Sequence, residues 1–422
     1  MIVKKALYGL KSSGASQRNM ISQTMKDAGY SNTYADPDVW RRRAVKSDGT
    51  HYYELILVYV DDIMSISQCP QKTMDMIGKL YDLKDSVGKP ERYLGVNLRK
   101  WMLPDGREVW SASGKDYIKN SLPLVKAMAE ARNSKLPGGK RAERPLPKTY
   151  KPELDTTALL IDDEASEYQQ MIGILRWAVE LGRIDIALEV SLLSSYLCAP
   201  RKGHLEATYN IFAYLDKHLE SNLVFDDKKP EIDESVFTKT NWSDSVYETE
   251  LPAAPPNMPE PLGKSVVISV FVDADHAGNV ITRRSQTGIL IYVNNAPIIW
   301  YTKKQNTVEA ATYGSEFVAA RISVELAEGL LYKLRMFGIP VELPINIFCD
   351  NRSVVNSSSR LEARLTKKHL GICFHRVREA CANGIARVGK EDGLTNLSDL
   401  LTKMVDTPKR WALLQILFPK GG

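Results

Sequence analysis

The sequence predicts a protein of mixed α and β structure, of the α+β and α/β classes, divided into several domains. A chain of 422 residues exceeds what one small hydrophobic core needs and suggests two to three domains. Two short apolar runs, residues 267–272 and 345–349, have the β-branched content of buried strands. Between residues 164 and 218, apolar side chains recur at helical spacing, so this stretch is expected to form packed core helices.

Composition and charge are those of an ordinary globular protein, with 44% hydrophobic and 25% charged residues. The net charge of +5 permits a polyanionic partner without requiring one. The five cysteines are scattered without metal-ligand spacing, which favours reduced thiols and predicts no zinc site. No apolar stretch reaches the length that spans a bilayer, so we expect an intracellular protein without a membrane partner.

The N-terminal part begins with a helix-compatible stretch, residues 16–28, and no strand precedes it, so the chain is expected to enter a fold partway through. Farther on, the apolar runs 51–60 and 63–67 meet at the paired carboxylates of Asp61 and Asp62. One interpretation is a plain hairpin turn, in which Asp is common. The other is a pair of ligands that holds metal ions against the phosphates of a nucleotide.

The middle of the chain alternates between ordered and irregular segments. Residues 92–110 predict a hairpin around a Pro-Asp-Gly turn, and residues 120–131 predict a helix. The tract 134–151 carries six basic residues among Pro and Gly, so it is either a solvated loop or a surface that follows a phosphate backbone. Residues 226–264 are acidic and rich in Pro, with few apolar side chains to bury, and predict a mobile linker.

Acidic residues stand at the ends of predicted elements in the C-terminal part of the chain. They are Asp273 and Asp275 after the strand 267–272, Glu316 in a helical stretch, Asp350 after the strand 345–349, and Asp399 at the start of a short helix, residues 397–404. Each of them alone is more typical of a turn or a helix cap. Four carboxylates that converge where a central strand ends, however, can bind a pair of hard divalent cations.

The order of these elements is that of ribonuclease H, with a hairpin between the first Asp and the Glu. The amino-acid sequence of residues 266–410 also resembles the RNase H domain of copia-type retrotransposon polyproteins. The stretches that carry this resemblance are Val272-Asp273-Ala274-Asp275-His276-Ala277-Gly278, Arg284-Ser285-Gln286-Thr287-Gly288, Ser315-Glu316-Phe317, Cys349-Asp350-Asn351 and Asp399-Leu400-Leu401-Thr402-Lys403. Upstream, Tyr59-Val60-Asp61-Asp62 resembles the polymerase signature of reverse transcriptases, and Leu7-Tyr8-Gly9-Leu10-Lys11 resembles the segment before it in the copia type.

The resemblance implies a fold in four parts. These are a truncated reverse-transcriptase palm and the start of a thumb in residues 1–131, a basic loop and helical connection in residues 132–225, the acidic linker 226–264, and an RNase H-like mixed-sheet domain in residues 265–422. It also implies a nucleotide pocket at Tyr8, Gly9 and Lys11, and a template–primer nucleic acid as partner. The family's first metal-binding Asp lies upstream of that segment, so Asp61 and Asp62 supply only part of a polymerase metal site. We therefore expect polymerase activity only together with the missing N-terminal segments of Pol.

For the C-terminal part, the resemblance implies hydrolysis of the RNA strand of RNA–DNA hybrids by two Mg²⁺ ions, with Mn²⁺ as a possible substitute. Asp273 would bridge the ions, Glu316 and Asp350 would hold one of them, and Asp399 the other. Asp275 is the less favoured alternative to Asp273, since both would point to the same face of the strand. Exposed basic side chains are candidate contacts to the nucleic-acid backbone: Arg283, Arg284, Lys303, Lys304, Arg364, Lys367 and Lys368.

His369 and His375 are interpreted as structural residues. The family resemblance places the protein in the cytoplasm, in a virus-like particle or in the nucleus. Two other functions remain open. A non-catalytic relic that only binds nucleic acid would have the same fold and basic surfaces without turnover. An integrase-like strand-transfer enzyme is disfavoured by the polymerase-like motif and by Asp399 in place of Glu.

Overall fold

The computed structural model describes residues 13–60, 62–81 and 88–419. The chain forms two compact units, one of Met1–Leu94, Ala253–Val266 and Gly329–Val341, the other of Gly95–Pro252, Val267–Glu328 and Glu342–Gly422. The predicted domain boundaries after residues 131, 225 and 264 stay a prediction. Within the described residues, no helix combines the length and the apolarity that a membrane crossing requires.

The first unit contains an antiparallel sheet in the order β1-β2-β3-β4. Its elements are α1 (Ser13–Asp27), β1 (Ser31–Asn32), β2 (Val39–Val45), β3 (His51–Tyr59), β4 (Asp62–Ile66), α2 (Pro70–Gly78) and β5 (Arg92–Tyr93). Met25 of α1 and Ile77 of α2 pack with Trp40 and Ile56 of the sheet into one buried core. The helix expected over residues 16–28 and the two strands expected over residues 51–67 are thus confirmed.

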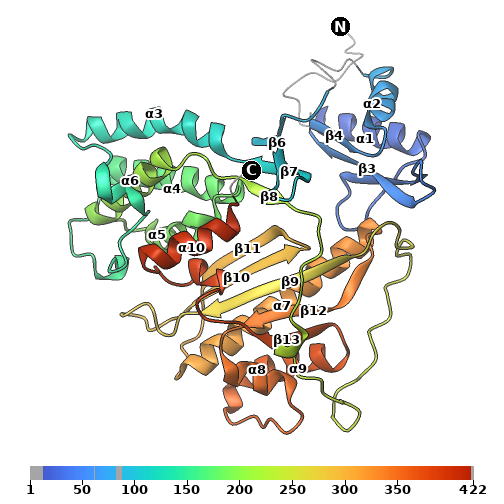
Figure 1. The fold of residues 1–422 in the computed structure, drawn as a ribbon. Coiled ribbons are helices and arrows are strands. Elements are labelled where there is room, and N and C mark those ends of the chain that lie inside the picture. Colours follow the sequence, from blue (N-terminus) through green and yellow to red (C-terminus); the bar gives the residue numbers. More distant parts are fainter. Residues whose placement is uncertain (1–12, 61, 82–87, 420–422) are drawn as a thin grey trace. The chain divides into compact units, whose positions relative to one another are not determined.

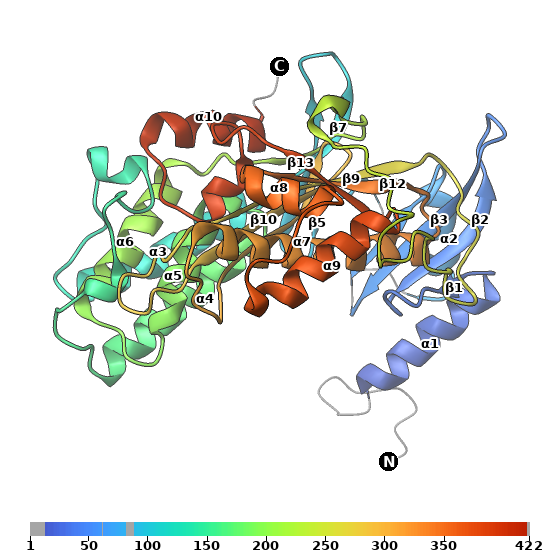
Figure 2. The same ribbon diagram turned by 90° about the horizontal axis from the view of Figure 1, so that it is seen from below.

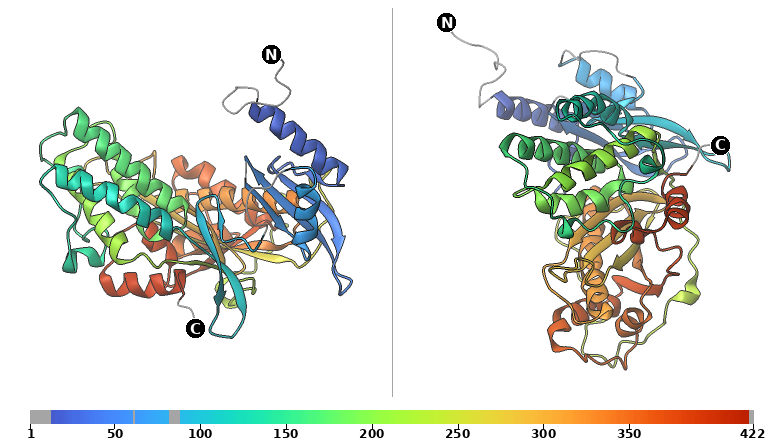
Figure 3. Two further views of the ribbon diagram at one scale, coloured as in Figure 1. Left: turned by 90° about the horizontal axis from the view of Figure 1, so that it is seen from above. Right: turned by 90° about the vertical axis from the view of Figure 1, so that its left-hand side faces the viewer.

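The second unit begins with an antiparallel sheet of β6 (Val96–Met102), β7 (Glu108–Ser113) and β8 (Leu223–Phe225). Between β7 and β8 lie four helices, α3 (Lys115–Ala131), α4 (Asp162–Glu180), α5 (Ala187–Leu193) and α6 (Lys202–Lys217), which share one core and are the green to cyan helices of Figure 3. Tyr168, Leu175, Val190 and Phe212 are buried in that core, as the helical spacing predicts.

The rest of the chain is built on a five-stranded mixed sheet in the order β11-β10-β9-β12-β13 (Figure 1). It belongs to the second unit, apart from Val266 and the segment Gly329–Val341, which belong to the first. Its elements are β9 (Val266–Ala274), β10 (Gln286–Val293), β11 (Ala296–Lys304), α7 (Thr312–Phe337), β12 (Val341–Cys349), α8 (Arg352–Ser359), α9 (Gly371–Ala382), β13 (Ala386–Lys390), the 3₁₀ helix η7 (Leu397–Leu401) and α10 (Thr407–Leu417). β9, β10 and β11 are antiparallel, whereas β12 and β13 are parallel. The order of elements follows the prediction, except that the helix expected over residues 397–404 is a shorter 3₁₀ helix.

The two faces of this sheet are covered by different helices. Figures 1 and 2 show α7 and α9 on one face and α10 on the other. Ile268, Val270 and Val272 of β9 are fully buried, and the alternate residue Phe271 contacts the apolar cluster of η7 and α10. Because side chains alternate along a strand, Asp273 points to the same face as Phe271, the face on which η7 packs.

The segment 226–247 differs from the mobile linker that its composition predicts. Phe237 is buried and forms a bridge with Gly389 of β13, and Glu234 makes an ion pair of 2.5 Å with Arg387. Trp242 is also buried, with the guanidinium of Arg378 4.8 Å from its ring. Two buried aromatic side chains and an ion pair therefore hold this segment against residues 378–389. The average composition of the segment, which is acidic and rich in Pro, does not reveal these contacts.

Candidate functional site

Three carboxylates from distant parts of the sequence meet at one end of the five-stranded sheet. Asp273 near the end of β9, Asp350 directly after β12 and Asp399 in η7 each place an oxygen within 4.8 Å of the others. Asp273 and Asp399 are almost completely buried, and Asp350 is half-buried. The sequence predicts this convergence, because strand ends that carry Asp lie at a common edge of the sheet.

Glu316 adds a fourth carboxylate from the first turns of α7. One of its oxygens lies within 4.8 Å of an oxygen of Asp350 and of the Cys349 thiol, so Asp350 belongs to both groups. Glu316 Oε2 is buried and has no hydrogen-bond partner in the described part of the chain. The structure thus brings together all four acidic residues that the resemblance implies. Asp350 belongs to both groups of possible ligands, and the role of Asp273 as the bridging ligand stays a prediction.

A close approach between β10 and η7 brings Asp399 to the cluster. Gly288 of β10 pairs with Asp273 across the antiparallel ladder. A Cβ at Gly288 would lie 2.6 Å from Thr402 Cγ2, 2.8 Å from Leu401 Cβ and 2.9 Å from Ser398 O. Only glycine therefore lets η7 pack this closely on the strand beside Asp273.

Two lysines, for which the sequence predicts no role, enter the cluster. Lys403 Nζ lies 2.6 Å from Asp399 Oδ1 and 3.3 Å from Asp273 Oδ2. Lys409 of α10 makes an ion pair with Asp399 Oδ2, and its ammonium also donates to Gly393 O at 2.6 Å. Thr402 donates a hydrogen bond to Asp273 Oδ2. Lys403 is one turn beyond Asp399, a spacing that could have indicated the pair, but nothing in the sequence links Lys409 to Asp399.

Burial and mutual repulsion shift the acidity of the cluster. Burial raises the pKa of Asp273 to about 7, with the Lys403 charge opposing and the Asp399 charge adding to the effect. Burial also raises the pKa of Glu316 to about 9, and the charges of Asp273 and Asp350 raise it further. Near neutral pH, Glu316 is thus largely protonated. Such displaced pKa values are typical of functional carboxylates.

The donor set fits a hard divalent cation. Four carboxylates supply the oxygen ligands that Mg²⁺ and Mn²⁺ prefer. The unpartnered Glu316 Oε2 carries a desolvation cost of about 1–3 kcal/mol, which a cation would remove. The Cys349 thiol is a poorer donor for such a cation, because burial raises its pKa well above the usual range and keeps it protonated.

Asp275, the alternative to Asp273, belongs to neither group of three ligands within the described residues. Its Oδ1 accepts a hydrogen bond from the backbone N–H of Gln286. A Cβ at Gly278 would lie 1.5 Å from Asp275 Oδ2, so the carboxylate fills the space above that glycine. Burial raises the pKa of Asp275 to about 6. Its contacts are those of a residue that holds the loop between β9 and β10.

The candidate backbone contacts lie on the surface of the second unit. Arg283, Arg284, Lys303, Arg364 and Lys368 are exposed, and Lys304 and Lys367 are half-buried. Two of the three histidines of the C-terminal part, His369 and His375, have protein partners. His369 Nε2 is 3.0 Å from Glu309 Oε2, and His375 Nδ1 is 2.7 Å from the Tyr247 hydroxyl.

The polymerase-like motif is only partly described. Tyr59 ends β3, Val60 occupies the turn with φ of 53°, and Asp62 pairs with Tyr59 as β4 begins. The described side chains are exposed, and a positive φ is rare for a β-branched residue, which marks a strained turn. Asp61, together with Tyr8, Gly9 and Lys11, lies outside the described residues, so the predicted nucleotide pocket and Asp61–Asp62 metal pair stay predictions.

Comparisons with known proteins give a consistent set of relatives. The retrovirus-related Pol polyprotein from transposon TNT 1-94 of Nicotiana tabacum is 25% identical over 96% of this chain and 27% of its own length. The corresponding polyprotein from transposon RE1 of Arabidopsis thaliana is 24% identical over 95% of this chain and 24% of its own. A truncated transposon Ty1-A Gag-Pol polyprotein of Saccharomyces cerevisiae is 24% identical over 95% of this chain and 30% of its own.

The chain thus spans about a quarter of the length of the plant polyproteins that it matches. No family model matches the sequence. Among solved structures, the N-terminal RNase H domain of a Mycobacterium tuberculosis protein, fused to maltose binding protein, is similar with a TM-score of 0.26 and 12% identity. That similarity covers 36% of this chain and 98% of the solved chain.

Proposed function

Because this chain is homologous to Pol polyproteins of copia-type transposons over 95–96% of its length, we propose that it acts as the reverse transcriptase/RNase H region of such a polyprotein. In this proposal, residues 265–422 form an RNase H-like domain that hydrolyses the RNA strand of RNA–DNA hybrids. The observation that carries the proposal is the convergence of Asp273, Asp350 and Asp399 within 4.8 Å, with Glu316 beside Asp350.

The carboxylates divide into two cation-binding groups. Asp273, Asp350 and Asp399 would hold one divalent cation, and Glu316 with Asp350 the other, so that Asp350 is shared. Bound Mg²⁺ ions would lower the pKa of the attacking water and stabilise the departing 3′ oxygen. The residues themselves supply a buried, preorganised set of oxygens, and burial strengthens every electrostatic interaction within it.

Lys403 and Lys409 have a distinct part in this proposal. Their ammonium groups neutralise Asp399 and Asp273 when no cation is bound, which keeps a buried cluster of negative charge intact. Lys403 is 44% exposed on its side chain and can turn outward, where its charge would face the phosphates of a bound nucleic acid. Lys409 is held more firmly, because Gly393 O also accepts from it.

Substrate choice would rest on the surface around the cluster. The exposed cations Arg283, Arg284, Lys303, Arg364 and Lys368 would contact the phosphate backbone. Contacts to 2′-hydroxyl groups in a wide, shallow minor groove would distinguish the RNA strand from the DNA strand. For the N-terminal part, we propose RNA-directed DNA polymerisation only within a longer polyprotein that supplies the missing metal ligand, inside the cell.

The test is cleavage of a labelled RNA–DNA hybrid by the purified chain with Mg²⁺, with Mn²⁺ and with EDTA. Duplex DNA and duplex RNA of the same sequence serve as substrate controls. Asp350→Asn removes a charge from the shared ligand and should lower the rate at least about 100-fold, the scale of losing a transition-state electrostatic contact. The matched control Asp244→Asn changes an exposed carboxylate outside the cluster and should leave the rate unchanged.

Metal-dependent cleavage of the hybrid that Asp350→Asn abolishes supports the proposal. Hybrid binding without cleavage under every metal condition would instead favour the non-catalytic nucleic-acid-binding relic. Equal cleavage by the wild type and by Asp350→Asn would remove the cluster from any catalytic role.

A further inference from the structure

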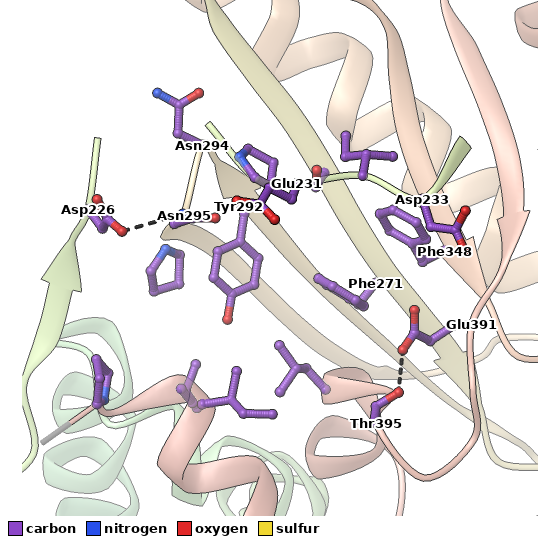
Figure 4. Close-up of a pocket in the computed structure, with 18 of the residues that line it drawn as sticks. Asp226, Glu231, Asp233, Phe271, Tyr292, Asn294, Asn295, Phe348, Glu391 and Thr395 are labelled. Carbon is purple, nitrogen blue, oxygen red and sulfur yellow. Dashed lines mark hydrogen bonds between the residues drawn. The ribbon is translucent and has the colours of Figure 1, made fainter. Parts of the chain in front are cut away.

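A second candidate site lies in a cavity on the sheet face that η7 and α10 cover. The cavity has a volume of about 590 Å³, within the range of about 300–1,000 Å³ that is typical of ligand sites. Phe271 of β9 and Phe348 of β12 form its floor, with their rings stacked at a centroid distance of 5.3 Å. The packed segment 226–236 and the end of α10 form other parts of the wall (Figure 4).

Two hydroxyl groups in this cavity have no partner within the described chain. Tyr292 of β10 is 9% exposed and Ser269 of β9 is 5% exposed, and the hydroxyl oxygen of each is buried without a hydrogen bond. Figure 4 shows the Tyr292 hydroxyl turned into the cavity. A buried hydroxyl without a partner is costly, which suggests that a ligand or solvent completes these bonds.

Four of the polar residues that line the cavity are acidic. Asp226, Glu231, Asp233 and Glu391 all line the cavity. Asp226 pairs with Arg107 at 2.7 Å and the exposed Glu231 pairs with Lys228 at 3.5 Å, which leaves Asp233 and Glu391. Lys390 is the one basic residue among the described lining residues, and its ammonium already donates to two backbone carbonyls, Asp350 O and Glu391 O, each at 2.6 Å.

We propose that this cavity is a binding site for a planar aromatic cation that carries a hydrogen-bonding group. The stacked Phe271 and Phe348 would contact the ring, the Tyr292 and Ser269 hydroxyls would pair with its polar edge, and Asp233 and Glu391 would attract its positive charge. The same carboxylates disfavour a phosphate group in this cavity. The cavity is therefore a site distinct from the proposed substrate surface.

The cavity shares one wall with the carboxylate cluster. Glu391 and Thr395, which line the cavity, are joined by a hydrogen bond of 2.5 Å at the base of a loop. In that loop, Gly393 O accepts from Lys409, the partner of Asp399, and an added Cβ at Gly393 would lie 3.6 Å from Asp350 Oδ2. A ligand that displaces Glu391 or Thr395 would therefore move the loop around Gly393, which lies beside Asp350 and holds the lysine partner of Asp399. We infer that occupancy of the cavity changes the affinity of the carboxylate cluster for Mg²⁺.

The binding test uses three indole probes of one shape on the full chain, followed by calorimetry. Tryptamine carries an ammonium group, tryptophol is neutral, and indole-3-propionate is an anion. Tryptamine should bind about two- to fivefold more tightly than tryptophol, the scale of partly exposed charge pairs, and indole-3-propionate should bind least. Tyr292→Phe removes the unpartnered hydroxyl and should weaken tryptamine binding about two- to tenfold.

Two matched pairs of variants locate the site. Ile416→Trp places a larger side chain at a 55% exposed lining position and should block tryptamine, while Ile372→Trp at an 81% exposed position outside the cavity should not. Glu391→Gln should reduce the preference for tryptamine over tryptophol, and the exposed Glu206→Gln on α6 should leave it unchanged. Equal binding of the three probes, no binding of any, or tryptamine binding unaffected by both Ile416→Trp and Tyr292→Phe would overturn the site.

The coupling is measured by thermal shift, as the Mg²⁺ concentration that gives half-maximal stabilisation. Saturating tryptamine should move that concentration at least about twofold, and Mg²⁺ should change the tryptamine affinity by the same factor, because coupling is reciprocal. Tryptamine binding with neither shift would overturn the coupling. The coupling rests on the proposed metal site, whereas the binding does not. A chain that fails to bind Mg²⁺ but still binds tryptamine would refute the proposed function and leave the cavity site standing.

Discussion

Replacing Asp350 with Asn should stabilise the metal-free protein while it abolishes metal binding and hydrolysis. Asp350 has an oxygen within 4.8 Å of oxygens of Asp273 and Asp399. At that separation, two unit charges repel each other by about 3–4 kcal/mol in an effective dielectric of about 20. Lys403 and Lys409 offset part of this repulsion. We therefore expect a net gain of about 1–3 kcal/mol in the free energy of unfolding at pH 8.

The gain should depend on pH with a defined sign. Because the pKa of Asp273 is raised to about 7, this carboxylate is mostly ionised at pH 8 and mostly protonated at pH 6. Since the ordinary pKa of Asp is about 3.9, Asp273 contributes stability that is full below about pH 4 and is lost as the pH rises from there to about 7. The advantage of Asp350→Asn should therefore be largest at pH 8 and shrink at pH 6.

The assay is thermal unfolding in EDTA and in excess Mg²⁺ at both pH values, with Asp244→Asn as the control. A gain of 1 kcal/mol corresponds to about 2–4 °C in Tm for domains of 150–250 residues. In Mg²⁺ the order should reverse, since the wild type gains binding free energy that the variant cannot. The reasoning would be refuted if the Asp350→Asn variant had a lower Tm than the wild type in EDTA at pH 8. It would also be refuted if Mg²⁺ raised the Tm of the variant as much as that of the wild type.

Three further predictions follow from the same geometry. Lys403→Met should lower Tm in EDTA and let Mg²⁺ bind at about two- to fivefold lower concentration, because the cation no longer displaces an ammonium worth about 0.5–1 kcal/mol; titration by thermal shift checks both effects. Gly288→Ala should lower the free energy of unfolding by about 1–3 kcal/mol and weaken Mg²⁺ binding, because the added Cβ would collide with η7. The control Gly329→Ala has open space around its Cβ and should leave the free energy of unfolding unchanged or raise it in the same assay. The rise in Tm caused by Mg²⁺ should be greater at pH 8 than at pH 6, because at low pH the cation must displace protons from Asp273 and Glu316. Burial raises the pKa values of these two carboxyls to about 7 and about 9. A rise in Tm that does not depend on pH would show that the cation binds elsewhere.

Local patterns predicted most of the second unit's C-terminal sheet. The β-branched runs are β9 and β12, and the alternation over residues 287–303 is the β10–β11 hairpin. The comparisons confirm the resemblance to copia-type Pol polyproteins. These features could be predicted because alternation and strand-end carboxylates are properties of neighbouring residues.

Other features depend on contacts between residues distant in sequence. The packing of Phe237 and Trp242 could not be predicted from a segment that is acidic and Pro-rich on average. The pairing of Lys409 with Asp399 depends on how α10 leaves η7, and the proximity of Glu316 to Asp350 depends on where α7 places Glu316.

The sequence by itself therefore determined which residues carry charge and in which elements they stand. The tertiary structure alone decided which charges meet, which lysines neutralise the cluster, and that a cavity with unpartnered hydroxyls adjoins it. The physical reason is that element type follows from short-range periodicity, whereas the electrostatics of a site depend on distances of a few ångströms between elements, and packing alone sets those distances.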